Sequence, residues 1–192
     1  MTIAGLTPAE ITVASRTYLW LAPVGTTAPT DATTAMPTPW KCAGLTTPDS
    51  LAFSTSPSFK EVPSGQSDYP ALRFQDGDSA TLAVQLLQWS AKNFQAVYGG
   101  GTVSTIAGTP TQYKFVPPKI GERVEVSAVA EVRMGALRHR FVYPRVFQIE
   151  GVQLDLKKSE ESRLPLSYAV LGGDDVDPWY LLTNSAAFAP PV

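Results

Sequence analysis

The chain of 192 residues contains one cysteine and one histidine, so it lacks the residues from which many chemical sites are built. The single cysteine, Cys42, excludes a disulfide framework within the chain and a zinc site built from cysteines. A lone cysteine also fits a reducing compartment. These scarcities direct attention away from cysteine-based metal and disulfide chemistry.

Charge and long apolar runs are also scarce. Charged residues make up 17% of the chain, and the formal net charge is −2. A basic nucleic-acid-binding surface would appear as an excess of Lys and Arg, so the composition argues against that class. No apolar stretch approaches the ~20 residues that a membrane-spanning helix needs. The N-terminal sequence MTIAGLTPAEITVASR lacks the basic start and apolar run of a signal peptide. We therefore expect a soluble protein made in the cytosol.

Proline and glycine are abundant, with 17 and 14 residues spread along the chain. Each proline removes a backbone donor and fixes φ, which favours short strands joined by turns. Residues 25–39 are rich in Thr, Ala and Pro and are predicted to form a loop. Alternating and β-favouring residues predict strands over 16–24, 40–45, 50–56, 79–88, 123–134, 137–151, 152–158, 163–173 and 178–184.

One short helix is predicted at about residues 90–98. Ser90 is a suitable N-cap, and Trp89 before it can pack on Phe94 in the first turns. Gly99 can end the helix because glycine adopts the left-handed conformation without a Cβ clash. The glycines that follow strengthen this prediction of a helix of two to three turns.

These elements predict one domain over residues 1–192. Its fold class is mainly β, an antiparallel β-sandwich or partial barrel with the one helix. We also expect a flexible N-terminal arm (1–15), a long loop (56–78) and a C-terminal tail (184–192). The loop is polar and long for a connection within a compact domain, and long loops are usually functional or mobile.

His139 is the first candidate for catalysis, because it lies between Arg138 and Arg140. In a strand, however, both arginines point to the opposite face. A catalytic histidine needs a nucleophile or an orienting carboxylate nearby, and the chain has no G-x-S-x-G or comparable motif. We therefore interpret LRHRFVYPRVFQIEG (137–151) as a wall strand, with the three basic residues as interface or surface groups and Pro144 as an irregularity.

Other candidate sites are equally weak. Cys42 is expected to be a small packed hydrophobic residue. GGDDVDPW (172–179) lacks the spaced oxygen ligands of an EF-hand loop, so a turn is favoured. YGGGTVSTIAGT (98–109) follows a helix, whereas phosphate-binding loops precede one. The sequence therefore predicts no catalytic residue, no metal site and no cofactor.

Four pieces in a fixed order carry a resemblance to a known family. They are WKCAGL (40–45), FKEVPSGQSDYPALRF (59–74), SATLAVQLLQWSAKNFQAVYGG (79–100) and RHRFVYPRVFQIEGVQLDLKKSEESRLPLSYAVL (138–171). In this order and spacing the chain resembles the major tail tube proteins of long-tailed, non-contractile bacteriophages, especially phages of actinobacteria. It departs from their pattern after Gly44, where TTPDS stands in place of a common Asp-Gly turn.

The resemblance implies a structural, non-enzymatic virion protein, assembled in the cytoplasm of the bacterial host. Its copies would form hexameric rings that stack into a tail tube, a conduit for DNA delivery. Further partners would be the tape measure, tail terminator and tail tip proteins, with no membrane involved. Neighbouring sheets would join into one inner barrel, with the helix outside it and the long loop reaching the next ring.

The resemblance also suggests roles for particular residues. The ring-stacking candidates in the long loop are Pro63, Gln66, Asp68 and Tyr69. The lumen-lining candidates, from the polar face of the central strands, are Glu125, Glu131, Arg133, Gln153, Asp155 and Lys157. Affinity for phosphate rises steeply with each unopposed Lys or Arg, so this mixed charge would let double-stranded DNA pass without specific binding.

Two alternatives remain open from the sequence. One is a β-sandwich decoration or carbohydrate-binding module, in which Trp20, Trp40 and Trp179 would be exposed on a sheet face. The other is a hydrolase of unrecognised type that uses His139 and Cys42.

Overall fold

The computed structural model describes residues 11–173 and 176–190 of the chain. It is mainly β, with one short α-helix, as the sequence predicts. The elements in chain order are β1 (Arg16–Pro23), β2 (Lys41–Cys42), β3 (Ala52–Val62), β4 (Leu72–Leu86), α1 (Ala91–Tyr98), β5 (Thr102–Ile106), β6 (Gln112–Val116), β7 (Val126–Met134), β8 (Leu137–Gln148), β9 (Leu164–Val170), β10 (Tyr180–Thr183) and the 3-10 helix η2 (Ala186–Phe188). No helix among these described residues is long and apolar enough to cross a membrane.

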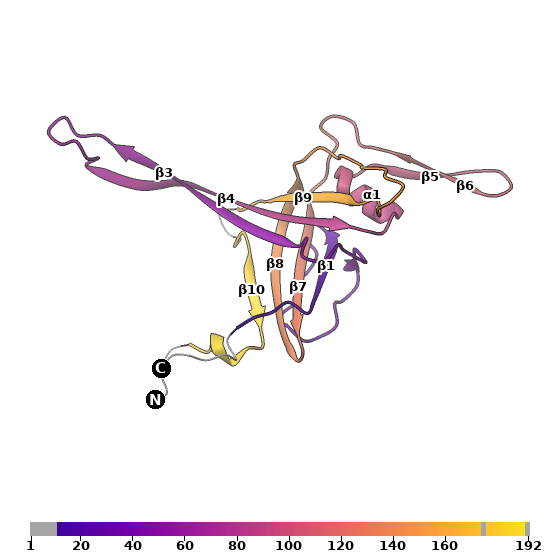
Figure 1. The fold of residues 1–192 in the computed structure, drawn as a ribbon, viewed down its shortest axis with the longest axis horizontal. Coiled ribbons are helices and arrows are strands. Elements are labelled where there is room, and N and C mark those ends of the chain that lie inside the picture. Colours follow the sequence, from indigo (N-terminus) through magenta and orange to yellow (C-terminus); the bar gives the residue numbers. More distant parts are fainter. Residues whose placement is uncertain (1–10, 174–175, 191–192) are drawn as a thin grey trace.

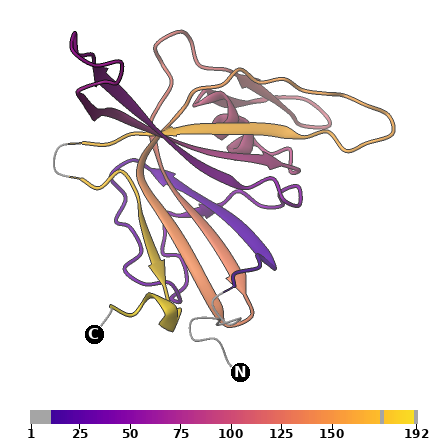
Figure 2. The same cartoon turned by 60° about the vertical axis from the view of Figure 1, so that its left-hand side comes forward.

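The main sheet has eight antiparallel strands and bends sharply at β8. Its order is β2-β1-β7-β8-β9-β4-β3, and β10 also pairs with β8. The first half of β8 pairs with β10, whereas its last residues, from Val146, pair with β9. The strands β9, β4 and β3 therefore cross over the layer of β1, β7, β8 and β10 (Figures 1 and 2). Such corners let one sheet cover itself. This open antiparallel arrangement confirms the predicted fold class, and the sheet does not close into a barrel.

The main core lies between these two layers and under α1. Ala128 and Ala130 of β7 point into it, and Tyr143 of β8 lies directly opposite Ala128. Its buried members are Leu19, Ala43, Leu82, Val84, Leu86, Val97, Ala128, Ala130, Tyr143, Val146, Leu164, Leu166 and Tyr168. Burying such side chains contributes roughly 25 cal/mol per Å² of apolar surface, so this cluster stabilises the folded subunit.

A second cluster covers the other face of the same strands. Val129 of β7 and Val142 of β8 are cross-strand neighbours on this face. Trp40 packs against them from the end of the segment 24–40, together with Ala28 and Met36 from within that segment. The sequence correctly predicts a loop here, but the loop lies over the sheet. Both faces of the central strands are therefore buried.

The helix α1 forms where the sequence predicts it. The Ser90 side chain accepts a hydrogen bond from the Asn93 N–H at the start, and Gly99 ends the helix with a positive φ of 73°. The ring centroids of Trp89 and Phe94 are 5.3 Å apart, so the residue before the N-cap packs on the first turns of the helix as predicted. Val97 is fully buried in the main core, so the helix packs against the sheet through this face.

The segment predicted as a long loop (56–78) is instead a long β-hairpin, which we call the arm. Strands β3 and β4 pair from Ala52 opposite Ala83 out to Val62 opposite Leu72, with one bulge beside Ser58. Only residues 63–71 form the turn at its tip. The prediction was wrong because most of the segment is polar and packs on no core, so that its two strands stabilise each other instead.

Two further segments differ from the prediction. Residues 152–158 are not a strand, although Val152 and Leu154 do pack against the main core. The alternation of apolar and polar residues in this segment reflects burial of one side, and not pairing with a neighbouring strand. Conversely, β5 and β6 form a second hairpin that the sequence did not predict. Its signal is two short β-favouring runs, TVSTI and QYKFV, around a Gly- and Pro-containing turn.

The predicted terminal arms lie only partly within the described residues. Residues 1–10 and 191–192 lie outside them. The Ser15 N–H donates to the Arg133 carbonyl, at 2.9 Å, just before β1 begins. Near the other end, η2 places Phe188 beside His139, with 6.1 Å between ring centroids. The flexibility of these arms stays a prediction.

Candidate assembly interface

Arg140 and Glu131 form an ion pair in the interior of the subunit. They face each other across β7 and β8, and their side chains are 1% and 0% exposed. Arg140 Nε donates to Glu131 Oε2 at 2.7 Å. Its other nitrogens donate to the carbonyls of Asp31 and Thr34, at 2.9 and 2.6 Å. The guanidinium therefore fixes the loop 31–34 against the sheet, and the prediction that Arg140 is an interface or surface group is wrong.

The neighbours of Arg140 complete this arrangement. Arg138 Nη1 donates to the Thr33 carbonyl at 2.7 Å, so both arginines hold the same loop. His139 points to the opposite face, as strand alternation predicts, but it is buried rather than at the surface. Within the described part of the chain its Nε2 has no hydrogen-bond partner. The two arginines thus have a structural role, and no carboxylate of the described residues forms a hydrogen bond or ion pair with the His139 imidazole.

Other candidates for chemistry are dispersed. Cys42 Sγ accepts a hydrogen bond from the Gly44 N–H at 3.4 Å and is partly buried, as a packed residue would be. Residues 11–173 and 176–190 contain no group of three or more potential metal ligands. Two of the three aspartates in 172–179, at positions 174 and 175, lie outside the described residues.

The three tryptophans of the carbohydrate-binding alternative do not form an exposed binding platform. Trp40 is buried and its indole N–H donates to the Thr27 carbonyl at 3.1 Å. Trp179 is partly buried and packs edge-on against Phe53, with centroids 5.0 Å apart. Trp20 packs into the second cluster. These positions remove the feature on which the carbohydrate-binding alternative depended.

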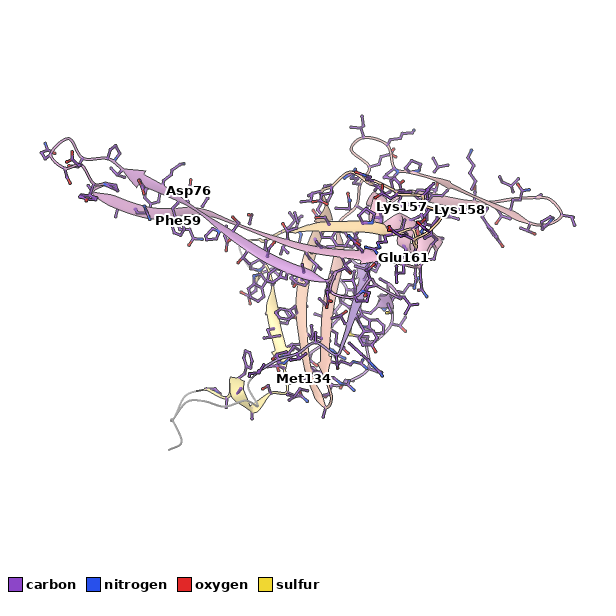
Figure 3. All side chains as sticks on the ribbon, viewed as in Figure 1. Phe59, Asp76, Met134, Lys157, Lys158 and Glu161 are labelled. Atoms are coloured by element: carbon purple, nitrogen blue, oxygen red, sulfur yellow. The ribbon has the colours of Figure 1, made fainter. Side chains whose placement is uncertain are left out.

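The predicted lumen-lining residues do not share one face. Glu131 is enclosed between the sheet and the loop 31–34, so its prediction as a lumen residue is wrong. Gln153, Asp155 and Lys157 lie in an irregular segment rather than a central strand. Figure 3 shows Lys157 near α1, whereas Met134, next to Arg133, lies at the far end of β7.

Of the remaining charged candidates, Glu125, Arg133 and Lys157 form ion pairs, whereas Asp155 accepts a hydrogen bond from Gln153. Arg133 pairs with Glu131, and its guanidinium carbon is 4.5 Å from the centre of the Tyr18 ring. Glu125 accepts two hydrogen bonds from Arg145, at 2.9 and 3.0 Å. Arg145 therefore holds the pKa of the Glu125 carboxyl below its usual range, chiefly through these bonds. The fixed charges on this part of the surface are mostly paired.

The arm carries all four predicted ring-stacking residues at or near its tip. Pro63, Gln66, Asp68 and Tyr69 are exposed, and the Tyr69 side chain is 80% exposed. Figure 1 shows β3 and β4 projecting far beyond the body of the subunit. The structure thus brings these residues together at the tip of the arm, away from the core.

Large apolar side chains are exposed along the arm. By the register of the two strands, Val62, Leu72 and Phe74 lie on one face of the ribbon and Phe59 lies on the other. Figure 3 labels Phe59 on β3. Each face of a two-stranded ribbon is unsupported unless another element packs on it. Nearly every residue from 54 to 79 is exposed in the single subunit. The arm therefore has the character of a surface that meets a partner.

Ion pairs across the ribbon keep it extended. Glu61 pairs with Arg73 on the opposite strand, and Lys60 Nζ is 3.1 Å from Asp76 Oδ2. Asp76 also accepts a hydrogen bond from the Ser58 hydroxyl at 2.7 Å. The Ser58 bond, followed by the Lys60 ammonium, lowers the pKa of Asp76. Charge is thus balanced within the stem of the arm.

The sequence was compared with models of protein families and with curated proteins. A family model described as phage tail tube protein matches residues 4–192. A search of curated proteins found no match. Because the family match spans almost the whole chain, the chain belongs to the phage tail tube protein family and is a structural component of a bacteriophage tail.

Proposed function

We propose that the chain assembles into hexameric rings, and that these rings stack into a tube through which DNA passes into the host. The single observation that carries this proposal is the arm, because its exposed apolar side chains have no packing partner within the described subunit. Membership of the tail tube family supports the same conclusion. On this view the protein is not an enzyme, and its function is its self-assembly.

The sheet edges support association as well. Strands β2 and β3 lie at the two ends of the main sheet, so each has one edge without a strand partner among the described residues. Exposed edges attract other strands unless they are covered or paired. Pairing between neighbouring subunits would join their sheets into a continuous inner barrel and remove these edges.

The arm is the proposed contact between rings. Ordering each backbone residue costs roughly 1–2 kcal/mol, and the arm buries little of its own surface in return. Contacts with another subunit would offset that cost. Pro63, Gln66, Asp68 and Tyr69 at the tip are the proposed contact residues.

The proposed lumen carries balanced charge. Glu125, Arg133, Gln153, Asp155 and Lys157 remain candidates for its lining, without Glu131. A mixed and largely paired surface would bind phosphate weakly, so double-stranded DNA could slide without specific binding. The further proposed partners are the tape measure, terminator and tip proteins, with assembly in the host cytoplasm.

The test replaces Pro63–Tyr69 with a short Gly/Ser turn. We expect near-normal circular dichroism, because the tip contributes nothing to either core cluster. Electron microscopy should show monomers or isolated rings with sixfold symmetry in place of long tubes. The matched control replaces the tip of the other hairpin, residues 107–111, and should still allow tubes. Tubes of normal length from the arm variant would show that the arm is not the stacking element.

A further inference from the structure

A pocket of about 440 Å³ lies beside α1, on the side of the subunit away from the arm. Its walls come from the end of β1, from β2 and the residues beside it, and from α1 with the glycine turn that follows the helix. Residues 122–126 and Tyr168 of β9 complete them. The residues that line it include Leu21, Pro23, Pro39, Cys42, Ala96, Val124 and Val126. Its volume is in the range of pockets that accept one large side chain or a small ligand.

The polar groups of the pocket are already bonded within the subunit. Asn93 Nδ2 donates to the carbonyls of Ala43 and Gln88, at 2.9 and 2.7 Å. Gln95 Nε2 donates to the Gly101 carbonyl at 3.0 Å, and the Tyr168 hydroxyl donates to the Ala96 carbonyl at 3.3 Å. Few donors or acceptors remain to bind a polar ligand. An apolar or aromatic group fits this interior better.

The rim of the pocket carries two exposed lysines. Lys92 Nζ donates to the Cys42 carbonyl at 2.5 Å, and Lys41 lies in the adjoining strand β2. Neither lysine forms an ion pair with another described residue. Glu122 also lines the pocket, where its carboxylate accepts from the Lys119 N–H at 3.1 Å. The rim is thus basic overall.

The arm tip has the complementary chemistry. Tyr69 is a large, rigid aromatic side chain with 80% of its surface exposed. Asp68 beside it forms no ion pair in the described residues, whereas Glu61 and Asp76 in the stem are paired. Tyrosines of this kind are typical anchors of protein interfaces, and one acid next to the anchor matches a basic rim.

The positions of the two surfaces determine the type of contact. In Figure 1 the arm projects to one side of the body, and α1 with its neighbouring hairpin lies on the other. An arm cannot reach the pocket of its own subunit from there. A contact between unlike surfaces of two copies repeats head to tail, which produces rings or stacks rather than closed pairs.

We infer that the arm tip of one subunit inserts Tyr69 into the pocket beside α1 of a second copy, with Asp68 facing Lys41 and Lys92. This inference rests on the proposed function, because it requires copies of the chain to assemble. It adds the receiving site, its anchor residue and its charge pairing.

Cys42 makes the contact testable, because it is the single cysteine of the chain and it lines the pocket. Ser67→Cys places a second thiol at the arm tip while keeping Tyr69. Assembled tubes of this variant, treated with a short bismaleimide, should give a ladder of covalent oligomers on a denaturing gel. Thr111→Cys, at the tip of the other hairpin, is the matched control and should give no ladder. Adding Cys42→Ser to Ser67→Cys should also abolish it.

Substitutions at the anchor test specificity. In the Ser67→Cys background, Tyr69→Ser should lower the ladder at least tenfold, whereas Tyr113→Ser, which removes another exposed tyrosine, should not. Asp68→Lys should also lower it, and adding Lys41→Asp should restore part of the yield.

The outcomes separate this inference from the proposed function. If the wild-type protein forms no rings or tubes, the proposed function fails. If tubes form but Ser67→Cys gives no ladder, or Cys42 is equally protected from maleimide in tubes with and without Tyr69, another segment or a small molecule occupies the pocket and this inference is overturned.

Discussion

The body and the arm of the subunit are built from the same sheet but depend on different neighbours. In the body, strands β7 and β8 are covered on both faces by side chains of their own chain. In the arm, strands β3 and β4 continue outward with both faces exposed. The body is therefore stabilised by contacts within its own chain. Substitutions in the arm should change the folding stability of the isolated subunit little, because the arm gains its contacts only from a second copy. Substitutions in the two regions should separate folding from assembly.

The largest effect on folding is expected at the buried ion pair. Glu131→Ala should lower the free energy of unfolding by about 3–5 kcal/mol, because it leaves the Arg140 guanidinium buried without its counter-ion. Denaturant unfolding of the isolated subunit measures this. The control is Glu125→Ala, which breaks the partly exposed pair with Arg145 just before the same strand begins. Its cost should stay below about 1 kcal/mol. Equal costs for the two variants would contradict the burial of Glu131.

Two phenylalanines on the same hairpin sharpen the comparison. Phe53, at the base of β3, packs on Tyr143 with ring centroids 5.2 Å apart, and also on Trp179. Phe53→Ala should cost about 3 kcal/mol of folding stability, because it leaves a gap in the main core. Phe74→Ala, out on the arm, should change stability by no more than about 0.5 kcal/mol. It should nevertheless reduce tube formation in light scattering. A large folding cost at Phe74 would mean that the arm packs on its own body.

The sequence predicts the body better than the arm because burial leaves a pattern. The alternation in β7 and the capping residues Ser90 and Gly99 are local signals, and the structure confirms the elements that they predict. The arm has no such signal, because its strands are mostly polar and have no core beneath them. Its pairing depends on the partner strand, which lies across a turn.

The ring-stacking role of the tip residues, including Tyr69, stays a prediction. The sequence suggests it through the family resemblance and through the length of the polar segment that carries these residues. Glu131 was misplaced because a charged residue in an alternating strand normally faces solvent. Its burial depends on the loop 31–34, which is distant in the chain and is held by Arg138 and Arg140. The pocket beside α1 left no sequence signal, because its walls come from five separate segments of the chain.

The smallest expected effect on stability concerns the conformation of the loop 31–34. The Asp31 carboxylate accepts hydrogen bonds from the N–H groups of Thr33 and Thr34, both at 2.6 Å. Aspartate often stabilises a turn in this way. The same loop presents the carbonyls that accept hydrogen bonds from Arg138 and Arg140. The turn therefore helps to hold the segment 24–40 over the second cluster.

These bonds predict a pH dependence of definite sign. Hydrogen bonds from Thr34, and then from Thr33, hold the pKa of Asp31 well below its usual range. A lowered pKa in the folded state means that the carboxylate contributes stability above its unfolded pKa of about 3.9, and that this contribution is lost as the pH falls further. Asp31→Asn keeps an acceptor oxygen but does not titrate. Both proteins are compared in the subunit with the shortened arm. The subunit that keeps Asp31 should have a higher melting temperature than the Asp31→Asn variant at pH 7, and this difference should shrink between about pH 4 and pH 2. Asp49→Asn, at an exposed aspartate without a side-chain hydrogen bond in the described residues, is the control. A difference that stays constant down to pH 2 would show that the Asp31 charge does not stabilise the loop.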